Sequence, residues 1–92
     1  MPVYKLEPIW GKEGHRDWKF SSLAPTTVWL RADSCNHARQ RIDLATRPEL
    51  ASAENIKAPW ISAELVSCSE DPSFNVPPDI AFLANGKITI KL

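Results

Sequence analysis

The fold of this chain is decided by residues 27 to 48, which read Thr-Val-Trp-Leu-Arg-Ala-Asp-Ser-Cys-Asn-His-Ala-Arg-Gln-Arg-Ile-Asp-Leu-Ala-Thr-Arg-Pro. In the first six residues every second side chain is aliphatic, which is typical of a strand with one buried face. Asp33 or Ser34 can then cap a helix, because its side-chain oxygen accepts a hydrogen bond from an N–H group of the first turn. Pro48 ends that helix, since the residue before a proline avoids helical geometry. The stretch therefore predicts a strand followed directly by a helix over about residues 34–46.

The apolar residues of the expected helix recur at spacings of three and four, so they form one stripe along its surface. They are Cys35, Ala38, Ile42 and Ala45. Because most of these side chains are small, the helix can lie close to a sheet. The preceding strand offers the nearest surface for it.

Two other stretches, residues 3–10 and 60–68, alternate in the same way and are predicted to be strands. Tyr4, Leu6 and Trp10 are expected on one face of the first. Pro8 places that strand at the edge of a sheet or ends it early.

The last thirteen residues predict a hairpin. Asn85-Gly86 lies between two extended runs, and both residues tolerate the backbone conformation of a tight turn. A two-residue turn there pairs Ala81 with Ile90 and Leu83 with Ile88, which makes one side of the hairpin apolar. The competing interpretation is a short helix over about residues 79–86, followed by one strand.

Two long segments lack a pattern and are expected to be irregular. Residues 11–26 are more loop than a small domain usually carries. We expect either that Trp18 and Phe20 dock this loop onto the core or that it is functional. In residues 69–79, which contain three prolines, Phe74 and Val76 are expected to tie the chain down.

Together these segments predict one small α+β domain over residues 1–92, with a mostly antiparallel sheet of about four to five strands and one main helix packed on one face. A single helix covers only one side of the sheet. The other side is therefore expected to carry two tryptophans among charged residues, namely Lys5, Glu7, Trp29, Arg31, Trp60 and Glu64.

Charge excludes the simplest argument for a nucleic-acid-binding protein. Eleven Lys and Arg residues balance eleven Asp and Glu residues, so the formal net charge at pH 7 is zero. Phosphate neutralisation needs a surplus of cations on one surface. A local basic patch stays open, because residues 1–47 carry eight basic and five acidic side chains, whereas residues 48–92 carry three and six.

Neither a membrane span nor a secretory signal is expected. The longest uncharged apolar stretch, residues 80–84, is far shorter than the roughly 20 residues of a membrane helix. The first residues lack the basic and apolar regions of a signal peptide. We therefore expect a cytoplasmic protein without a membrane partner, in which Cys35 and Cys68 are reduced, buried thiols.

Residue spacing argues against a metal, a cofactor or a catalytic residue. Cys35 and His37 are two positions apart on the expected helix and point away from each other, so they cannot share a metal ion. A Cys-His nucleophile pair fails for the same reason. Gly11 and Gly14 are too few, with an acidic residue between them, for a phosphate-binding loop. We therefore expect no metal site, no cofactor site and no catalytic residue.

Tryptophan and arginine residues are the candidates for a binding surface. Trp18 lies among potentially cationic neighbours, as stacking on a nucleic-acid base would need, but its other role is to cover the core. Trp29 and Trp60 are either buried or part of an exposed aromatic patch. The candidate patch comprises Trp18, Trp29, Arg31, Trp60, Arg16, Arg39 and Arg41.

The motif Asp17-Trp18-x-x-Ser21, followed by residues 28–34 and Ala38-Arg39, resembles a group of small bacterial proteins with no assigned activity. These proteins pair a tryptophan-serine segment with a strand ending in Arg-Ala, a helix cap and a helix containing Ala-Arg. The resemblance covers roughly residues 4–47. It implies a small α+β fold and a bacterial origin, and it provides no functional residue to transfer.

Three functional hypotheses follow. The first is a non-enzymatic small module that binds an unknown protein partner or itself, since an edge strand or an apolar sheet face can pair with a copy. The alternative is weak single-stranded nucleic-acid binding through the basic and aromatic residues. The third is an enzyme whose site is assembled from dispersed residues.

Overall fold

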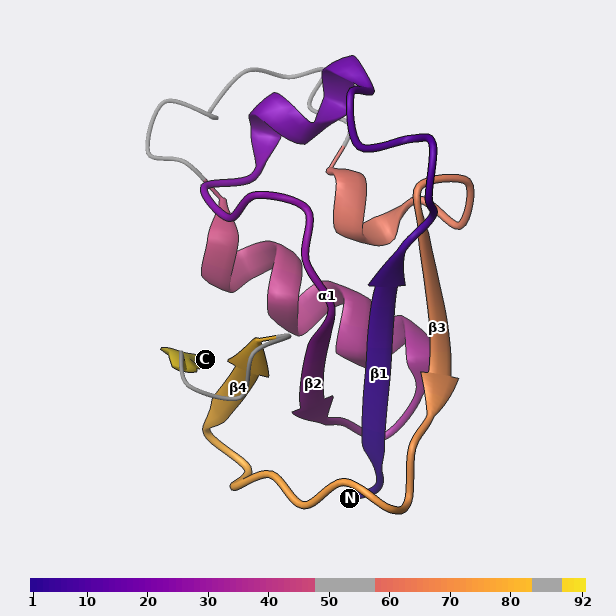
Figure 1. Cartoon of the computed structure of the whole chain (residues 1–92). Helices are drawn as coiled ribbons and strands as arrows, with labels where there is room; N and C mark the ends of the chain where they lie inside the picture. Colours follow the sequence, from indigo (N-terminus) through magenta and orange to yellow (C-terminus); the bar gives the residue numbers. More distant parts are fainter. Residues whose placement is uncertain (48–57, 84–88) are drawn as a thin grey trace.

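The computed structural model describes residues 1–47, 58–83 and 89–92, without the side chains of residues 19 and 20. It confirms the α+β architecture: one main helix packs on an antiparallel sheet in the order β3-β1-β2-β4-β5 (Figure 1). The strands are β1 (Val3–Pro8), β2 (Val28–Arg31), β3 (Val66–Glu70), β4 (Ile80–Leu83) and β5 (Thr89–Lys91). The helices are α1 (Cys35–Thr46) and two short 3-10 helices, η1 (Arg16–Phe20) and η2 (Pro59–Ile61).

Helix α1 begins and ends where its sequence predicts. The Ser34 hydroxyl caps it by accepting a hydrogen bond from the N–H of His37 at 3.1 Å. Arg47, which precedes a proline, has extended backbone and ends the helix.

The buried stripe of α1 differs from the expected one at both ends. Ala38 and Ile42 are fully buried as expected, but Cys35 is only half-buried and Ala45 is exposed, whereas Asp43 and Thr46 are buried. Thr46 satisfies its hydroxyl by donating to the C=O of Ile42 at 2.7 Å. A polar residue with a local acceptor can therefore occupy a core position that the hydrophobic pattern assigns to alanine.

Strand β1 lies in the interior of the sheet, and Pro8 is its last residue. The pairing of β1 with β2 ends at Leu6, which lies opposite Val28. At Pro8 there is therefore no residue of β2 that would need a hydrogen bond from the N–H group that proline lacks. The expectation that Trp10 continues the buried face is wrong. The chain turns at Gly11, whose φ is +91°, and Trp10 is 82% exposed.

The predicted strand over residues 60–68 is only partly correct. Pro59 opens the 3-10 helix η2, and the C=O of Ser62 accepts hydrogen bonds from the N–H groups of both Leu65 and Val66. The chain therefore turns before β3 begins at Val66. Trp60 consequently lies on η2 and not on the open face of the sheet.

The C-terminal strands pair in the predicted register, with Ala81 opposite Ile90. The competing short helix over residues 79–86 is wrong for residues 80–83, which form β4. The expected turn at Asn85-Gly86 and the pair Leu83–Ile88 involve residues outside the described part of the chain.

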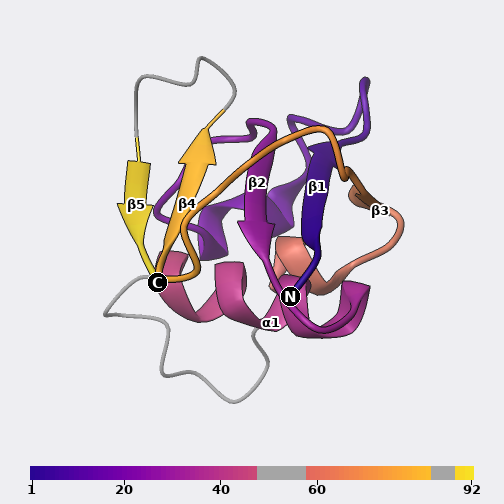
Figure 2. The same cartoon turned by 90° about the horizontal axis from the view of Figure 1, so that it is seen from below.

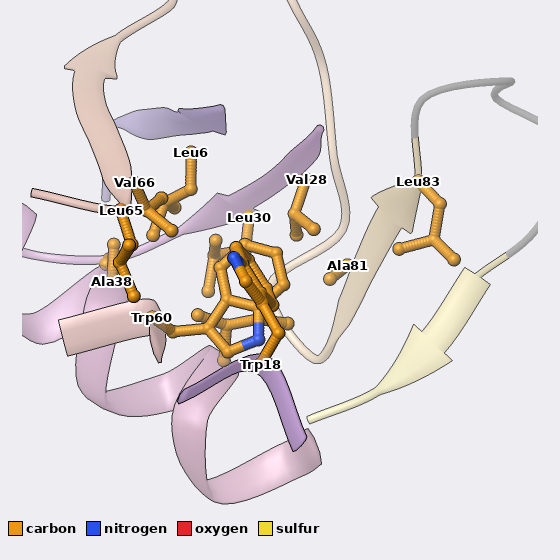
Figure 3. Packing of buried hydrophobic residues seen from close by; sticks show 12 residues of the cluster. Leu6, Trp18, Val28, Leu30, Ala38, Trp60, Leu65, Val66, Ala81 and Leu83 are labelled. Atoms are coloured by element: carbon orange, nitrogen blue, oxygen red, sulfur yellow. The ribbon is translucent and has the colours of Figure 1, made fainter. Parts of the chain in front are cut away.

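Two different elements cover the two faces of the sheet. Helix α1 lies against one face, and residues 71–79, which we call the strap, cross the other face between β3 and β4 (Figure 2). Trp18 and Trp60 lie together below the helix-facing side chains of the sheet (Figure 3). Trp18 thus docks the long loop onto the core, as one of the two interpretations predicted; the side chain of Phe20 lies outside the described part of the chain. Val76 of the strap is also fully buried.

Candidate functional site

Arg31 fastens the strap to the sheet. Its guanidinium group donates to the backbone C=O of Val76, to the C=O of Met1 at 2.6 Å and to the side-chain oxygen of Asn75 at 2.8 Å. Because Arg31 is paired with three acceptors in its own chain, this cation is not available to an external anion without breaking these bonds.

Arg39 and Arg41 are used in the same way on α1. Arg39 donates to the C=O of Trp60 at 3.1 Å, which joins α1 to η2. Arg41 donates to the C=O of Arg31 at 2.7 Å and to that of Pro78 at 3.0 Å. Both arginines therefore connect segments that are distant in sequence.

Trp18 and Trp60 belong to the core. Their rings are 5.2 Å apart at an angle of 88°, an edge-to-face contact. Trp60 is fully buried, and its indole N–H donates to the hydroxyl of Ser21 at 3.0 Å. Because both rings are buried, neither Trp18 nor Trp60 offers an exposed ring face on which a partner could stack.

Trp29 is half-buried under the strap. Its ring stacks on Phe74 at 4.5 Å, and its indole N–H donates to the Asp71 carboxylate at 3.1 Å. Hydrogen bonds from Ser73 and then from Trp29 lower the pKa of Asp71 below its ordinary value. The Lys5 ammonium lies 5.8 Å from the centre of the Trp29 ring, within cation–π range.

Arg16 is the candidate with the most exposed side chain, at 81%, and its nearest acidic partner is Asp17 at 4.0 Å. The seven candidate residues therefore do not form one patch. They lie in the core, under the strap, on the face of α1 and on η1.

A cleft of about 490 Å³ lies where η1, the end of α1 and η2 meet, and Arg16 is the candidate residue in its wall. Among its other residues, His15, Asp17 and Ser62 are the types found in a nucleophilic triad. In such a triad the histidine Nδ1–H donates to the carboxylate. Here the Nδ1 of His15 instead accepts the N–H of Asp17 at 3.1 Å. This arrangement does not prepare the histidine as a general base.

The outer edge of β3 is a surface of a different kind (Figure 1). The backbone N–H of Asp71 donates to the C=O of Val3 at 2.8 Å, and that of Ile9 donates to the C=O of Leu65 at 2.9 Å. In an antiparallel strand, alternate residues direct their N–H and C=O groups to the same side. Since the pairing of β1 with β3 is continuous, the odd-numbered residues of β3 bond to β1. The even-numbered residues direct their groups outward.

The outward groups belong to Val66, Cys68 and Glu70, but Val66 is fully buried, so that only those of Cys68 and Glu70 are open to another chain. The N–H of Val66 is already used, because it donates to the C=O of Ser62 at 3.0 Å. The N–H and C=O groups of Cys68 and Glu70 have no strand beside them among the described residues. They form a short row of backbone donors and acceptors at the sheet edge.

This edge has little of the usual protection against pairing. Sheet edges are commonly blocked by charged side chains, above all lysine, by proline or by a very short strand. Strand β3, Val-Ser-Cys-Ser-Glu, has neither lysine nor proline; its one charged residue is Glu70 at its end, and Ser67 and Ser69 are exposed. The opposite edge, β5, carries Lys91. The β3 edge is therefore better suited to accept another strand.

Sequence reasoning missed this site because its position depends on the strand order. The five residues of β3 were expected to be extended only as far as Cys68, and nothing in their composition places them at an edge.

Cys35 and Cys68 form no disulfide. Cys68 lies on the helix-facing side of β3 and packs against the core. Its burial, followed by a hydrogen bond with the Cys35 thiol, raises the pKa of Cys68 to about 12. A thiol with so high a pKa is a poor nucleophile at neutral pH.

Comparison of the chain with family models, curated proteins and solved structures gave no match. Within residues 1–47, 58–83 and 89–92, no helix has the length and apolar character needed to cross a membrane. The same part of the chain contains no group of three or more His, Cys, Asp or Glu residues placed to hold a metal ion.

Proposed function

We propose that this chain is a non-enzymatic protein-binding module that adds an extended segment of a partner to the edge of β3. The supporting observation is the outward row of N–H and C=O groups on Cys68 and Glu70. An extended chain placed beside such a row completes its hydrogen bonds and continues the sheet. The small exposed side chains of Ser67 and Ser69 leave room for it.

Single-stranded nucleic-acid binding has less support. Stacking requires an accessible aromatic face, and phosphate contacts require available cations. The candidate tryptophans are buried or stacked within the chain, and Arg31, Arg39 and Arg41 donate to its own acceptors. An enzyme with a dispersed site has less support too, given the hydrogen-bonding state of His15 in the cleft.

A cytoplasmic location in a bacterium belongs to the same proposal. Two cysteines that lie in contact without a disulfide suit a reducing compartment.

Glu70→Pro is the variant that tests strand addition. Proline removes the outward N–H at this position, while the inward hydrogen bonds of β3 to β1 stay intact, so the fold should persist. Glu70→Ala is the matched control, because it removes the same side chain but keeps the N–H. Peptides selected from a library of extended sequences against the full chain are the probe.

We expect selected peptides to bind the wild type and Glu70→Ala with the same affinity. They should bind Glu70→Pro at least about tenfold more weakly. In NMR spectra they should shift the amide signals of Cys68 and Glu70 most. Peptides that bind all three proteins equally, or a library that yields no binder, would contradict the proposal.

A further inference from the structure

We infer that Cys35 and Cys68 are a modification site, at which a low-molecular-weight disulfide oxidises the two thiols to an intramolecular disulfide that fastens the start of α1 to β3. The inference does not depend on strand addition, because it concerns the helix-facing side of the sheet. It is carried by the contact between two thiols that come from distant segments of the chain.

The fold itself brings the two cysteines together. Cys35 is the first residue of α1, and Cys68 is the middle residue of β3. After β2 the chain crosses behind β1, and α1 begins beside β3 (Figure 1). Cys68 lies opposite Leu6 on the side of the sheet that faces the helix, and there its thiol meets the Cys35 thiol in a hydrogen bond. Since the chain has two cysteines, each thiol has one possible partner within the chain.

Tyr4 of β1 lies beside both thiols. Desolvation and then the charge of Glu70 raise the pKa of Tyr4 above its ordinary value, and Cys35 and Cys68 add to this effect. Electrostatic effects of this kind fall off with distance, so both thiols are close to the same phenol group. Cys35 and Cys68 are thus neighbours on one side of β1.

A dissolved reagent can reach this thiol pair. Both cysteines are half-buried and not sealed in the core. Cys68 also lies in a strand that has no neighbour on its outer side among the described residues. The pair therefore combines contact between the two thiols with access from solvent.

The oxidation proceeds by two thiol–disulfide exchanges. The Cys35 thiolate attacks one sulfur of the small disulfide, whose S–S bond breaks, so that a mixed disulfide forms on Cys35 and one small thiolate leaves. The Cys68 thiolate then attacks the Sγ of Cys35 and releases the second small thiolate. In total the two protein thiols lose two electrons and two protons, and the small disulfide takes them up to become two thiols.

The environment of Cys68 sets the order of these steps. Burial and the hydrogen bond with Cys35 raise the pKa of Cys68 to about 12, so this thiol is the poorer first nucleophile. In the mixed disulfide the Cys35 thiol no longer raises the pKa of Cys68, whereas the nearby Arg39 still lowers it. The second attack is also intramolecular, and proximity offsets a small fraction of thiolate.

The disulfide closes a loop that contains the rest of α1 and the whole of η2. A cross-link of this kind stabilises a protein mainly by restricting the unfolded chain. If the two thiols lie in contact in the folded chain, the bridge forms without distorting the fold. The oxidised chain should therefore resist urea better than the reduced chain.

The test incubates the folded full-length chain with oxidised glutathione in the absence of urea and then blocks the remaining thiols. Mass spectrometry should show a monomer that has lost two hydrogens and, after digestion, a peptide pair linked through Cys35 and Cys68. The urea midpoint of this species should rise by about 1 M or more over that of the reduced chain.

Two single variants test the order of the steps. Cys68→Ala should keep one glutathione on Cys35, because the second thiol is missing. Cys35→Ala should acquire glutathione on Cys68 at least about tenfold more slowly, since burial still disfavours that thiolate. Circular dichroism under reducing conditions confirms that both variants are folded.

A folded wild type that forms no internal disulfide, or that forms one only in urea, overturns the inference. A disulfide that lowers the urea midpoint also overturns it, because the thiols are then not placed to bond within the fold. Faster modification of Cys68 than of Cys35 in the single variants overturns the order of the steps. Peptide binding to the β3 edge is measured in reducing buffer, so strand addition stands or fails separately.

Discussion

Replacing Arg31 by methionine should destabilise the chain by detaching the strap. Methionine keeps an unbranched apolar stem but removes the guanidinium group with its bonds to Val76, Met1 and Asn75. The C=O of the fully buried Val76 then loses its charged donor. The adjoining stack of Trp29 on the strap should loosen with it.

The magnitude follows from the number and exposure of these bonds. A hydrogen bond to a charged group contributes about 1.5–3 kcal/mol when well shielded. Two of the three bonds of Arg31 are exposed, which reduces their contributions. We therefore expect a loss of about 2–4 kcal/mol, against a total stability of about 5–15 kcal/mol for a small domain.

Urea unfolding followed by circular dichroism measures this loss, with Arg16→Met as the matched control. The side chain of Arg16 is 81% exposed, and its ion pair spans 4.0 Å, so its replacement should change stability by less than about 0.5 kcal/mol. If Arg31→Met loses no more than Arg16→Met, the role of Arg31 as a fastener of the strap is refuted.

Three further outcomes are expected. Trp60→Ala should cost about 3–5 kcal/mol, because it empties a fully buried ring site in the core; a urea-unfolding loss below about 1 kcal/mol would show that the ring is not packed as described. The pKa of Cys68 is raised to about 12, so at pH 8 this thiol should react with iodoacetamide far more slowly in the folded chain than in the urea-unfolded chain. Replacing Cys35 by alanine should speed the reaction of Cys68 in the folded chain. Equal rates in the folded and unfolded chains would exclude the raised pKa. The pKa of Asp71 is lowered, so its contribution to stability is present above its ordinary value of 3.8 and is lost as the pH falls through the lower folded value. The indole N–H signal of Trp29 should therefore titrate below pH 3.8, and a midpoint at or above that pH would contradict the bond.

Local signals in the sequence were sufficient for most elements of the fold. The cap at Ser34, the proline after Arg47 and the aliphatic alternation of β2 act within a few residues, so they predicted α1 and its preceding strand. The same holds for the register that pairs Ala81 with Ile90. Trp60 was misplaced, because alternation alone does not distinguish a strand from a 3-10 turn followed by a strand.

The candidate site was harder to predict, because it depends on contacts between distant segments. Arginines near aromatic rings are typical of a binding surface, but Arg31 and Arg41 find backbone acceptors in the strap, more than thirty residues away. The open edge of β3 follows from the strand order, which no local pattern specifies. The pairing of β3 with β1 in the structure is needed to tell which N–H groups of β3 face outward.

Amide hydrogen exchange within β3, measured by NMR with and without a selected peptide, tests the central claim most directly. Without peptide the amides of Ser67 and Ser69 should exchange slowly, since they bond to β1, while those of Cys68 and Glu70 exchange fast. A saturating amount of the peptide should slow Cys68 and Glu70 alone. Outward amides that are already protected in the free chain, or that remain fast with the peptide bound, would contradict an edge open to strand addition.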